Sequence, residues 1–386
     1  MIYIHIPFCR SFCTYCDFYS EVAAGCRKAE ETALFEEYGK ALALEIRSRG
    51  SEITDDVNTL YIGGGTPSVL PLSVFRSILR SLGDAGHGGP FDEFTVEVNP
   101  DDIVEKGLAF VEGLMELGVS RISMGVQSFD DGILRWMNRR HDSASARKAY
   151  SILEEAGVAD ISIDLIFGLP QLTDTGWRDT LSQALDISSR GSLPHHISSY
   201  QLSVEPGSAL ASLVGRGQWS EASEELCAEQ YSVLCEVLAS AGYRHYEISN
   251  FAKQGSESKH NTKYWKCVDY IGLGLGASSC LDGKRFANST DFDGYFNGYQ
   301  KSEEYTLTQS EKMSEFIILG LRLIKDGVSK QEFANRFNTD IYDVFGKIIN
   351  KHIANGLLCD NGENLVLTPR AYFISNYVMS DFVNNM

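Results

Sequence analysis

The sequence predicts an α/β protein built from repeated strand–helix units, followed by a small C-terminal domain of a different kind. Short apolar segments rich in β-branched residues alternate with longer amphipathic segments, which is typical of a parallel sheet covered by helices. Six such units precede residue 306, near which the strand–helix alternation ends. Six units are too few for a closed barrel of eight, so we expect an incomplete barrel that is open on one side. A doubly wound sheet would give a similar pattern.

The expected elements follow from this alternation. Strands are predicted at residues 3–6, 58–62, 93–98, 121–126, 162–167 and 196–202. Helices are predicted at 28–49, 72–82, 103–117, 143–156, 176–188 and 221–241. The first helix illustrates the reasoning, because its apolar residues recur every three or four positions and form one inward face. These residues are Leu34, Phe35, Tyr38, Leu42 and Ile46.

The last 80 or so residues have a different pattern of predicted helices and strands. Helical patterns at 311–324, 330–337 and 342–355 precede a probable hairpin through Asn361 and Gly362, where the Asn-Gly pair favours a tight turn. Helices followed by a small wing predict a winged-helix-like α+β domain over 306–386, after a barrel over 1–250 and a connecting segment over 251–305. Such domains often bind DNA, but this one has nearly equal numbers of basic and acidic residues. DNA binding is therefore the weaker interpretation.

Composition limits the classes of molecule that the protein could bind and indicates the cellular compartment. The chain of 386 residues has a formal charge of −18, which disfavours nucleic acid and anionic lipid as partners. No apolar run is long enough to span a bilayer, and we find no secretory signal. Three of the nine cysteines cluster and six are scattered, a reduced pattern that predicts a cytoplasmic protein.

The three clustered cysteines are the strongest chemical signal. Cys9, Cys13 and Cys16 are spaced C-x3-C-x2-C in a short loop after the first predicted strand. Soft thiolates that converge in one loop select zinc, Cu(I) or an iron–sulfur cluster. A structural zinc site needs a fourth ligand, for which His5 or Cys26 would be available, but no second C-x2-C knuckle exists. Three ligands on a four-iron cluster would leave one iron open to a small molecule, which is the interpretation we favour.

Polar residues follow several of the predicted strands, where a βα barrel carries its ligands. Gly63 to Gly65, with Thr66, would let a ligand approach the backbone closely, although a tight turn alone would explain them. Glu97 ends the third strand and is either a ligand contact or a surface carboxylate. Asp164 interrupts an apolar strand, where its charge needs a partner.

A second segment, His260-Asn261-Thr262-Lys263-Tyr264-Trp265, lies in the connecting region ahead of a glycine-rich loop at 272–279. Histidine is a common ligand of haem iron, and neighbouring aromatic rings stack on porphyrins. A single histidine beside a tryptophan is more often structural, and that alternative stays open here.

The cysteine loop with its flanking Tyr3 to Phe8 resembles the radical S-adenosylmethionine (SAM) superfamily, in the branch of oxygen-independent coproporphyrinogen III oxidase-like proteins and HemW-like haem chaperones. The resemblance covers nearly the whole chain and favours the partial (β/α)6 barrel over the doubly wound sheet. It implies a [4Fe-4S] cluster on Cys9, Cys13 and Cys16, SAM at the open iron, and cleavage of SAM to a 5′-deoxyadenosyl radical by an electron from the cluster. The SAM-binding residues that it implies are Tyr3, Tyr15, Gly64, Gly65, Thr66, Glu97, Gln127, Arg139 and Asp164. Arg139 has an alternative as an ordinary salt-bridge partner.

Three features favour the HemW-like side of this branch. Phe18 stands where the oxidase (dehydrogenase) typically has a fourth cysteine. The chain begins close to the cysteine motif, without the N-terminal extension that this enzyme has. The H-N-x-x-Y-W run is a HemW signature that is implicated in haem handling. The resemblance thus implies haem as cargo, with His260 as a candidate ligand, a client such as a respiratory haem protein, and an electron donor such as flavodoxin or ferredoxin. The alternative is the dehydrogenase itself, which converts coproporphyrinogen III to protoporphyrinogen IX by radical oxidative decarboxylation. A DNA- or partner-binding sensor is the least favoured, and whether the protein is an enzyme stays open.

Overall fold

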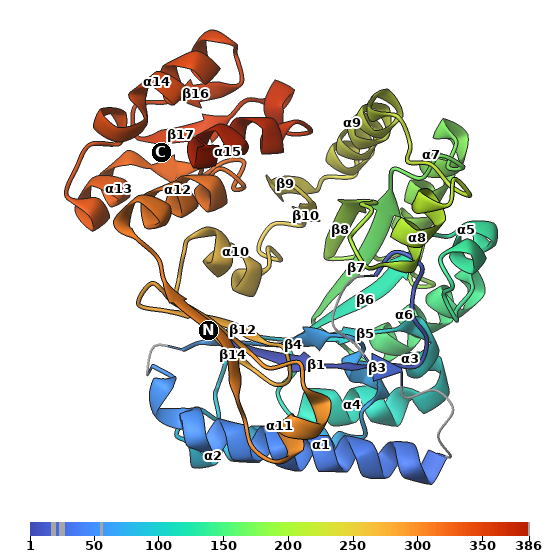
Figure 1. Cartoon of the computed structure of the whole chain (residues 1–386). Helices are drawn as coiled ribbons and strands as arrows, with labels where there is room; N and C mark the ends of the chain where they lie inside the picture. Colours follow the sequence, from blue (N-terminus) through green and yellow to red (C-terminus); the bar gives the residue numbers. More distant parts are fainter. Residues whose placement is uncertain (17–20, 23–27, 55–56, 385–386) are drawn as a thin grey trace.

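A nine-stranded sheet runs through most of the computed structural model, which describes residues 1–16, 21–22, 28–54 and 57–384 (Figure 1). Its order is β11-β1-β4-β5-β6-β7-β8-β10-β9. The six strands from β1 to β8 are parallel and follow one another in sequence order, as expected for a partial (β/α)6 barrel. They are β1 (Ile2–Ile6), β4 (Thr59–Gly64), β5 (Glu93–Val98), β6 (Arg121–Gln127), β7 (Asp160–Phe167) and β8 (His196–Gln201). All six predicted strands are confirmed.

The sheet extends beyond the six predicted strands at both edges. At one edge β11 (Ile271–Leu273) pairs in parallel with β1. At the other, β10 (Asn250–Ala252) pairs antiparallel with β8, and β9 (Arg244–Glu247) follows it. The sequence did not predict these strands, because three or four residues are too few to show a periodicity of two.

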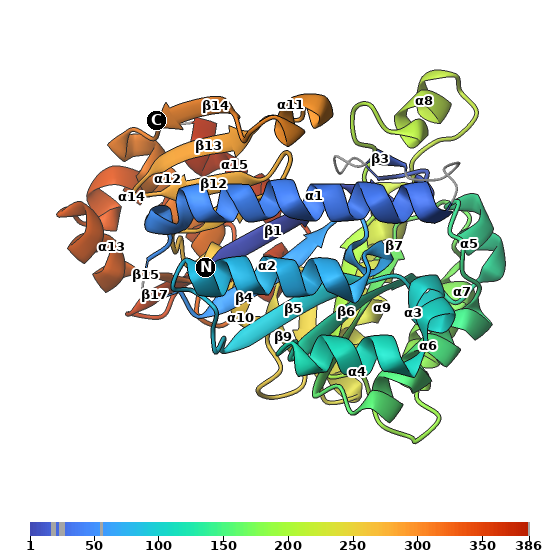
Figure 2. The same cartoon turned by 90° about the horizontal axis from the view of Figure 1, so that it is seen from below.

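Helices cover the outer face of the sheet, and Figure 2 shows α1 and α2 running along it. The helices of this layer are α1 (Lys28–Arg49), α2 (Leu72–Asp84), α3 (Pro100–Lys106), α4 (Leu108–Glu116), α6 (Ser143–Ala156), α7 (Asp174–Leu185) and α9 (Glu224–Ser240). The single helix expected at 103–117 is wrong: Gly107, with φ of +70°, separates α3 from α4. Two short helices, α5 (Asp131–Trp136) and α8 (Ala209–Gly215), were not predicted. The inward face expected on α1 is confirmed, since Phe35, Tyr38, Leu42 and Ile46 are buried in the main core.

A small antiparallel sheet links the barrel to the end of the chain. It consists of β12 (Ser278–Leu281), β13 (Lys284–Asn288) and β14 (Lys301–Thr306), with α10 (Lys259–Trp265) before it and α11 (Phe292–Phe296) within it. A buried ion pair on α1 anchors this region. Arg49 binds Glu45 at 2.9 Å and the carbonyl oxygen of Gly272 at 2.7 Å, and Asn288 donates to Glu45 at 2.7 Å. Because the charges of Arg49 and Glu45 are buried and paired, removing either would leave the other unpaired.

The C-terminal domain, α12 to α15, has its own hydrophobic core, which includes Ile317, Phe333 and Phe345. Its helices are α12 (Gln309–Gly320), α13 (Lys330–Phe337), α14 (Ile341–Ala354) and α15 (Ser375–Asn384), and its small sheet is β15 (Val328–Ser329), β17 (Asn364–Leu367) and β16 (Leu358–Asp360). The hairpin expected at Asn361 and Gly362 joins β16 to β17 and forms the wing. The last helix was not predicted, and the expected domain boundaries stay predictions.

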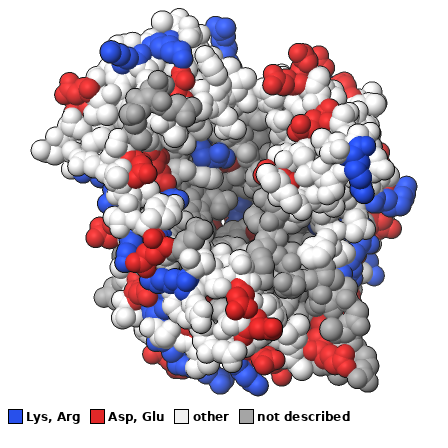
Figure 3. Space-filling model, in the orientation of Figure 1, with Lys and Arg blue, Asp and Glu red and all other residues white. Residues whose placement is uncertain are grey.

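On the face shown in Figure 3, acidic and basic side chains are interspersed, and no broad basic field covers this face. Among the described residues, no helix combines the length and apolar composition that crossing a bilayer would require.

Candidate functional site

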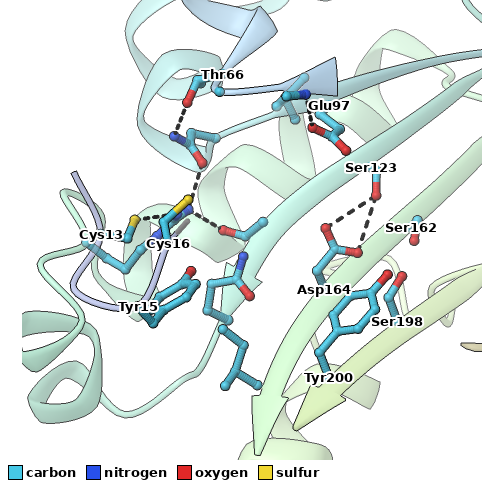
Figure 4. Close-up of a pocket in the computed structure, with 18 of the residues that line it drawn as sticks. Cys13, Tyr15, Cys16, Thr66, Glu97, Ser123, Ser162, Asp164, Ser198 and Tyr200 are labelled. Atoms are coloured by element: carbon cyan, nitrogen blue, oxygen red, sulfur yellow. Dashed lines mark hydrogen bonds between the residues drawn. The ribbon is translucent and has the colours of Figure 1, made fainter. Parts of the chain in front are cut away.

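A cavity of about 390 Å³ lies at the carboxyl ends of the parallel strands. Cysteines from the loop after β1 line one side, and polar side chains from β4 to β8 line the other (Figure 4). The sequence-predicted residues that line it are Cys9, Cys13, Tyr15, Cys16, Gly64, Gly65, Thr66, Glu97, Gln127, Arg139 and Asp164. Residues scattered over about 155 positions of the chain therefore meet at one end of the barrel, which is where barrels carry their sites.

Backbone hydrogen bonds attach the cysteine loop to the glycine segment after β4. The N–H of Gly65 donates to the carbonyl oxygen of Ile6 at 2.8 Å, and the N–H of Thr66 donates to that of Phe8 at 2.7 Å. The thiol of Cys9 lies 3.4 Å from the hydroxyl of Thr66. The glycine segment thus fixes the start of the cysteine loop, a role that the sequence did not reveal.

The end of α5 holds the other side of the loop. The N–H of Thr14 donates to the carbonyl oxygen of Met137 at 3.1 Å, and the Thr14 hydroxyl donates to that of Trp136 at 2.9 Å. The Asn138 amide donates to the carbonyl oxygen of Phe12 at 2.7 Å. Asn138 has φ of +57°, in the left-handed region that Asn tolerates better than most residues. Its backbone turn directs the next residue, Arg139, into the cavity.

Gly65 is packed too tightly to carry a side chain. A Cβ added there would lie 2.7 Å from the carbonyl oxygen of Phe8 and 2.9 Å from that of Ile6, and neither backbone group can swing away. We expect Gly65→Ala to lower the iron content after reconstitution to less than about half that of the wild type, because overpacking of about 1–3 kcal/mol displaces the cysteine loop. Iron per chain and the melting temperature measure this. Gly215→Ala is the control, since a Cβ there meets nothing within 4 Å; equal iron in the two variants would contradict the prediction.

Arg139 places a positive charge against the cysteines. Its Nη1 donates to the Cys13 sulfur at 3.4 Å, and its Nη2 donates at 2.7 Å to both the Asn99 side-chain oxygen and the Gly125 carbonyl oxygen. Burial alone would lower the pKa of Arg139, but Tyr15 and Cys13 hold that pKa raised, so the guanidinium stays charged. Among the described residues, its hydrogen-bond partners are a thiol, an amide and a carbonyl, and none is a carboxylate. The charge of Arg139 favours the thiolate form of Cys13, which is the form that metals bind.

Gln127 reaches the cavity through a distorted strand end. Its φ is +66°, and the pairing of β6 with β7 shifts register between Gly125 and Gln127. A non-glycine residue in this region costs about 1–3 kcal/mol, and such strain concentrates at functional sites. The bulge redirects the Gln127 side chain to the cavity that Arg139 also lines.

Two partly buried carboxylates face the cavity opposite the cysteines. Glu97 accepts hydrogen bonds from the Tyr61 hydroxyl at 2.6 Å and the Gly64 N–H at 3.0 Å, and Asp164 accepts from the Ser123 hydroxyl at 3.3 Å (Figure 4). Burial raises the pKa of Glu97 to about 7, with a further contribution from the charge of Asp164. Burial likewise raises the pKa of Asp164 to about 6, against hydrogen bonds from Ser198 and Ser123 that lower it.

In the described part of the chain, neither carboxylate forms an ion pair with a lysine, arginine or histidine. The positive charges of Arg121 and Arg139 lower the pKa of Asp164 but do not offset the effect of its burial. Partly buried anions without a directly bonded counter-ion are costly unless a ligand supplies the positive charge. Glu97 and Asp164 therefore suit a ligand that carries cationic groups, such as an ammonium or a sulfonium.

Two expected residues do not line the cavity. Tyr3 sits on the inner side of β1 with its hydroxyl 2.9 Å from Nδ1 of His5. His260 is 1% exposed; its Nδ1 lies 3.1 Å from the Thr59 hydroxyl and its Nε2 lies 3.4 Å from the Tyr264 hydroxyl. Burial lowers the pKa of His260 to about 3. With both ring nitrogens occupied, His260 fits the structural alternative better than that of a haem ligand.

The zinc alternative can also be compared with the geometry. His5 does not line the cavity, while Cys26 and the branch-distinguishing Phe18 lie outside the described residues. Within the part of the chain that the structure describes, no three His, Cys, Asp or Glu side chains are grouped as ligands of one metal ion.

Several lining residues were not predicted. They are Tyr61, Asn99, Ser123, Ser162, Ser198 and Tyr200. A signal exists for Ser162, because it and Asp164 alternate with apolar residues along β7 and so face the same side. Ser198 and Tyr200 are also two positions apart on β8, but Ser199 between them and Gln201 after them are polar, so no such alternation marks them. Polar residues on the inner side of a barrel strand are the pattern to look for.

Comparison with known proteins agrees with this geometry. Residues 3–184 match the radical SAM superfamily, and residues 307–374 match the HemN C-terminal domain. Over 384 residues the chain is 32% identical to the heme chaperone HemW of Lactococcus lactis subsp. lactis, covering 99% of this chain and 96% of that protein. The chain belongs to the HemW family of radical SAM proteins. The heme chaperone HemW of Bacillus subtilis is also 32% identical, over 100% of this chain and 99% of the relative.

Coproporphyrinogen III oxidase (HemN) from Escherichia coli, described as a radical SAM enzyme, superimposes with a TM-score of 0.82 over 100% of this chain and 90% of its own. At 21% identity this likeness shows the shared fold alone. Membership of the HemW family and of the radical SAM superfamily implies a [4Fe-4S] cluster and SAM. The three thiols, the guanidinium beside them and the unpaired carboxylates fit this pair of cofactors.

The two carboxylates predict how binding of SAM depends on pH. SAM carries a sulfonium and an ammonium, so we expect it to favour the ionised form of these carboxylates. We expect affinity to rise by up to about tenfold per carboxylate per pH unit below the pKa values of about 6 and 7, and to level off above about pH 8. Calorimetric titration from pH 5.5 to 8.5 measures this, with S-adenosylhomocysteine, which lacks the sulfonium charge, as a comparator of weaker dependence. A flat profile for SAM would contradict the prediction.

In the ligand-free protein, the contribution of Glu97 and Asp164 to folding stability falls as pH rises, opposite to the expected affinity for SAM. Because their pKa values are raised on folding, their contribution to stability is complete below their unfolded pKa values near 4 and is lost as pH rises through about 6 and 7. The increment in melting temperature that SAM produces should therefore grow over the same range.

Proposed function

We propose that this protein is a haem chaperone that binds a [4Fe-4S] cluster, SAM and haem, and delivers haem to a client haem protein. The observation that carries the proposal is the likeness to heme chaperones named HemW over the whole length of the chain. The proposal includes a cytoplasmic location, an electron donor such as flavodoxin or ferredoxin, and a client of the respiratory type.

The cavity supplies the parts that such a protein needs. Cys9, Cys13 and Cys16 would hold the iron, and Arg139 keeps a positive charge beside Cys13. Glu97 and Asp164 would accept the cationic groups of SAM. When bound, the reduced cluster supplies the electron that cleaves SAM. The residues of this chain position the loop, hold the guanidinium and set the charge of the two carboxylates.

A first experiment separates the chaperone from the dehydrogenase. The reconstituted protein is incubated anaerobically with SAM, a low-potential reductant and coproporphyrinogen III, and the products are searched for protoporphyrinogen. We expect none from protein with a full cluster. Formation of many protoporphyrinogen molecules per protein chain would overturn the proposed chaperone function and show oxidative decarboxylation instead.

A second experiment tests directly whether the protein binds haem and transfers it. Ferric haem is titrated into the same preparation and followed by its Soret absorbance, and the haem-loaded protein is then mixed with apomyoglobin as acceptor. We expect saturation near one haem per chain and transfer to the acceptor faster than release from a haem-loaded serum albumin control. Absence of saturable haem binding would overturn the proposal.

A further inference from the structure

A fully buried carboxylate outside the barrel cavity contacts three of the segments that surround the cysteines. Asp102 lies in the first turn of α3 and has no exposed surface. It does not border the barrel cavity, so it acts on a ligand in that cavity only through the residues that it contacts. Because a buried charge needs partners, those residues show what Asp102 does.

The first partner of Asp102 follows the glycine segment. Ser68, two residues after Thr66, donates its hydroxyl to Oδ2 of Asp102 at 2.7 Å, and its oxygen accepts the N–H of Asn99 at 3.1 Å. Ser68 is fully buried, like Asp102. A hydrogen bond to an ionised acceptor is stronger than one between neutral groups. This bond therefore joins the glycine segment to the start of α3, beside the Asn99 side chain that accepts from Arg139.

The other oxygen of Asp102 faces two guanidinium groups from different segments. Nη1 of Arg10 lies 3.7 Å from Oδ1, and Nη1 of Arg140 lies 3.6 Å from it. Arg10 belongs to the cysteine loop, and Arg140 directly follows Arg139. Within the described part of the chain Oδ1 accepts no hydrogen bond, so its attraction to the two guanidiniums is an ion pair with each. One negative charge thus draws the cysteine loop and the segment of Arg139 and Arg140 toward the same point.

Arg10 has further anchors that Arg140 lacks. It also pairs with Glu105 in α3, and with Glu31 in α1 at 3.4 Å. Among the described residues, the ion pair of Arg140 is with Asp102. Loss of the Asp102 charge should therefore free Arg140 and loosen Arg10. It should not unfold the cysteine loop, whose backbone hydrogen bonds to the glycine segment and to the end of α5 remain.

We propose that Asp102 is a positioning residue of the iron–sulfur site, which holds the cysteine loop, the glycine segment and the segment of Arg139 in one arrangement. It thereby sets how firmly the cluster is retained and at what potential the cluster accepts an electron. The inference rests on the cluster of the proposed function, and it is independent of haem and of haem delivery.

The charges around Asp102 give this role a sign that a purely structural role lacks. A reduced cluster carries one more negative charge than an oxidised one, so nearby positive charge raises its reduction potential and nearby negative charge lowers it. Asp102→Asn keeps an oxygen for Ser68 but removes the negative charge between the guanidiniums. Arg10→Gln removes a positive charge from the same group. Both variants loosen the cysteine loop, yet they should shift the potential in opposite directions.

The test uses the full chain after anaerobic reconstitution of the cluster. The wild type is compared with Asp102→Asn, Arg10→Gln and the double variant in a redox titration followed by the cluster absorbance, and in a measurement of iron release to excess chelator. We expect Asp102→Asn to favour reduction about tenfold, a shift of about +59 mV for one electron. Arg10→Gln should lower the potential, and the double variant should return toward the wild type.

Iron release should show that the two residues share a contact. We expect each single variant to release iron about fivefold faster than the wild type, which is the upper range for a partly exposed ion pair. The double variant should release iron more slowly than the product of the two single effects would give, because residues in contact are not additive.

Glu45→Gln is the matched control. Glu45 is also buried and paired with an arginine, Arg49, at 2.9 Å. Its hydrogen-bond partners, Gly274, Asn288 and Tyr295 besides Arg49, lie outside the cysteine loop and the glycine segment. This variant should lower the melting temperature while the potential and the rate of iron release stay at the wild-type values.

The outcomes separate this inference from the proposed function. A wild type that assembles no cluster overturns the iron–sulfur site and the proposed function together. A wild type with a full cluster, and with the same potential in Asp102→Asn and Arg10→Gln, overturns the role of Asp102 and leaves the haem chaperone standing. Shifts of the same sign in both variants, or an equal shift in Glu45→Gln, show a general loss of stability and also overturn the inference.

A further pair of variants decides the question if Asp102→Asn does not fold. Arg10→Lys keeps the positive charge that Arg10→Gln removes. A potential that falls in Arg10→Gln and is restored in Arg10→Lys supports the inference, and equal potentials in the wild type and both variants overturn it.

Discussion

Replacing Cys13 with alanine is expected to abolish the visible absorbance of the iron–sulfur cluster and to remove most of the iron that the wild type retains after anaerobic reconstitution. Cys13 is one of three thiols that line the barrel cavity, and it is the one that accepts a hydrogen bond from Arg139. Two remaining thiolates cannot hold a four-iron cluster, since cysteine ligands are what fix such clusters in proteins. The visible absorbance of the cluster and the iron content per chain measure the effect.

The matched control is Cys359→Ala, which removes an exposed cysteine far along the chain and should keep the full cluster. Because Cys13 is only partly buried and its loop is held by backbone hydrogen bonds from Gly65, Thr66 and Thr14, the variant should fold with a melting temperature close to that of cluster-free wild type. A Cys13→Ala protein with a full cluster would remove the basis of the site assignment.

The barrel was predictable because its strands are long and its helices carry their own end signals. The helix at Ser143–Ala156 was placed correctly: Asp142 caps its start through the Ser145 N–H, and Gly157 ends it in the left-handed region. The helix at Lys330–Phe337 is bounded in the same way by Ser329 and Asn338. Gly107 was missed as a break because an isolated glycine in a helical pattern is usually tolerated.

The residues of the candidate site also differ in whether local sequence patterns could predict them. The cysteine loop and the glycine segment are local patterns, so they could be predicted from spacing. Arg139 and Gln127 could be placed only through the family resemblance, since their approach to the cavity depends on the turn at Asn138 and the bulge after Gly125. Asn99, which orients Arg139, depends on which strand ends are neighbours, and that follows from the sheet order.

Tyr3 and His260 belong to segments that carry the family resemblance, yet neither borders the barrel cavity, and their expected roles stay predictions. A strand residue that points inward can lie at either end of a barrel, and the sequence pattern fixes the side without fixing the depth. His260 begins α10, where Glu93 accepts its N–H at 3.0 Å and the imidazole packs 5.2 Å from Tyr61. The motif that contains His260 therefore packs the start of α10 into the barrel.

Replacing Glu97 with glutamine is expected to weaken the binding of SAM by about 10- to 100-fold at pH 7.5. Glu97 is partly buried, accepts hydrogen bonds from Tyr61 and Gly64, and has no ion-pair partner among the described residues. Glutamine keeps the shape and an acceptor oxygen for Tyr61 but removes the charge that a cationic ligand meets. Loss of one partner of a buried charge pair costs about 2–5 kcal/mol, and the lower end applies because Asp164 remains. The dissociation constant by calorimetry measures this, with exposed Asp174→Asn on α7 as a control that should match the wild type.

Asp164→Asn should weaken binding more than Glu97→Gln near pH 6.5, because Glu97, with a pKa of about 7, is mostly protonated there, whereas Asp164, with a pKa of about 6, is mostly ionised. The charge of Asp164 raises the pKa of Glu97, so its removal lets Glu97 ionise at lower pH and offsets part of this loss. Near pH 8.5 both carboxylates of the wild type are ionised, so this compensation disappears and the two variants should converge. Equal affinities of both variants and the wild type at each pH would show that the cationic groups of SAM bind elsewhere. A difference between the variants that narrows as pH rises would instead show that one ligand charge is shared between Glu97 and Asp164.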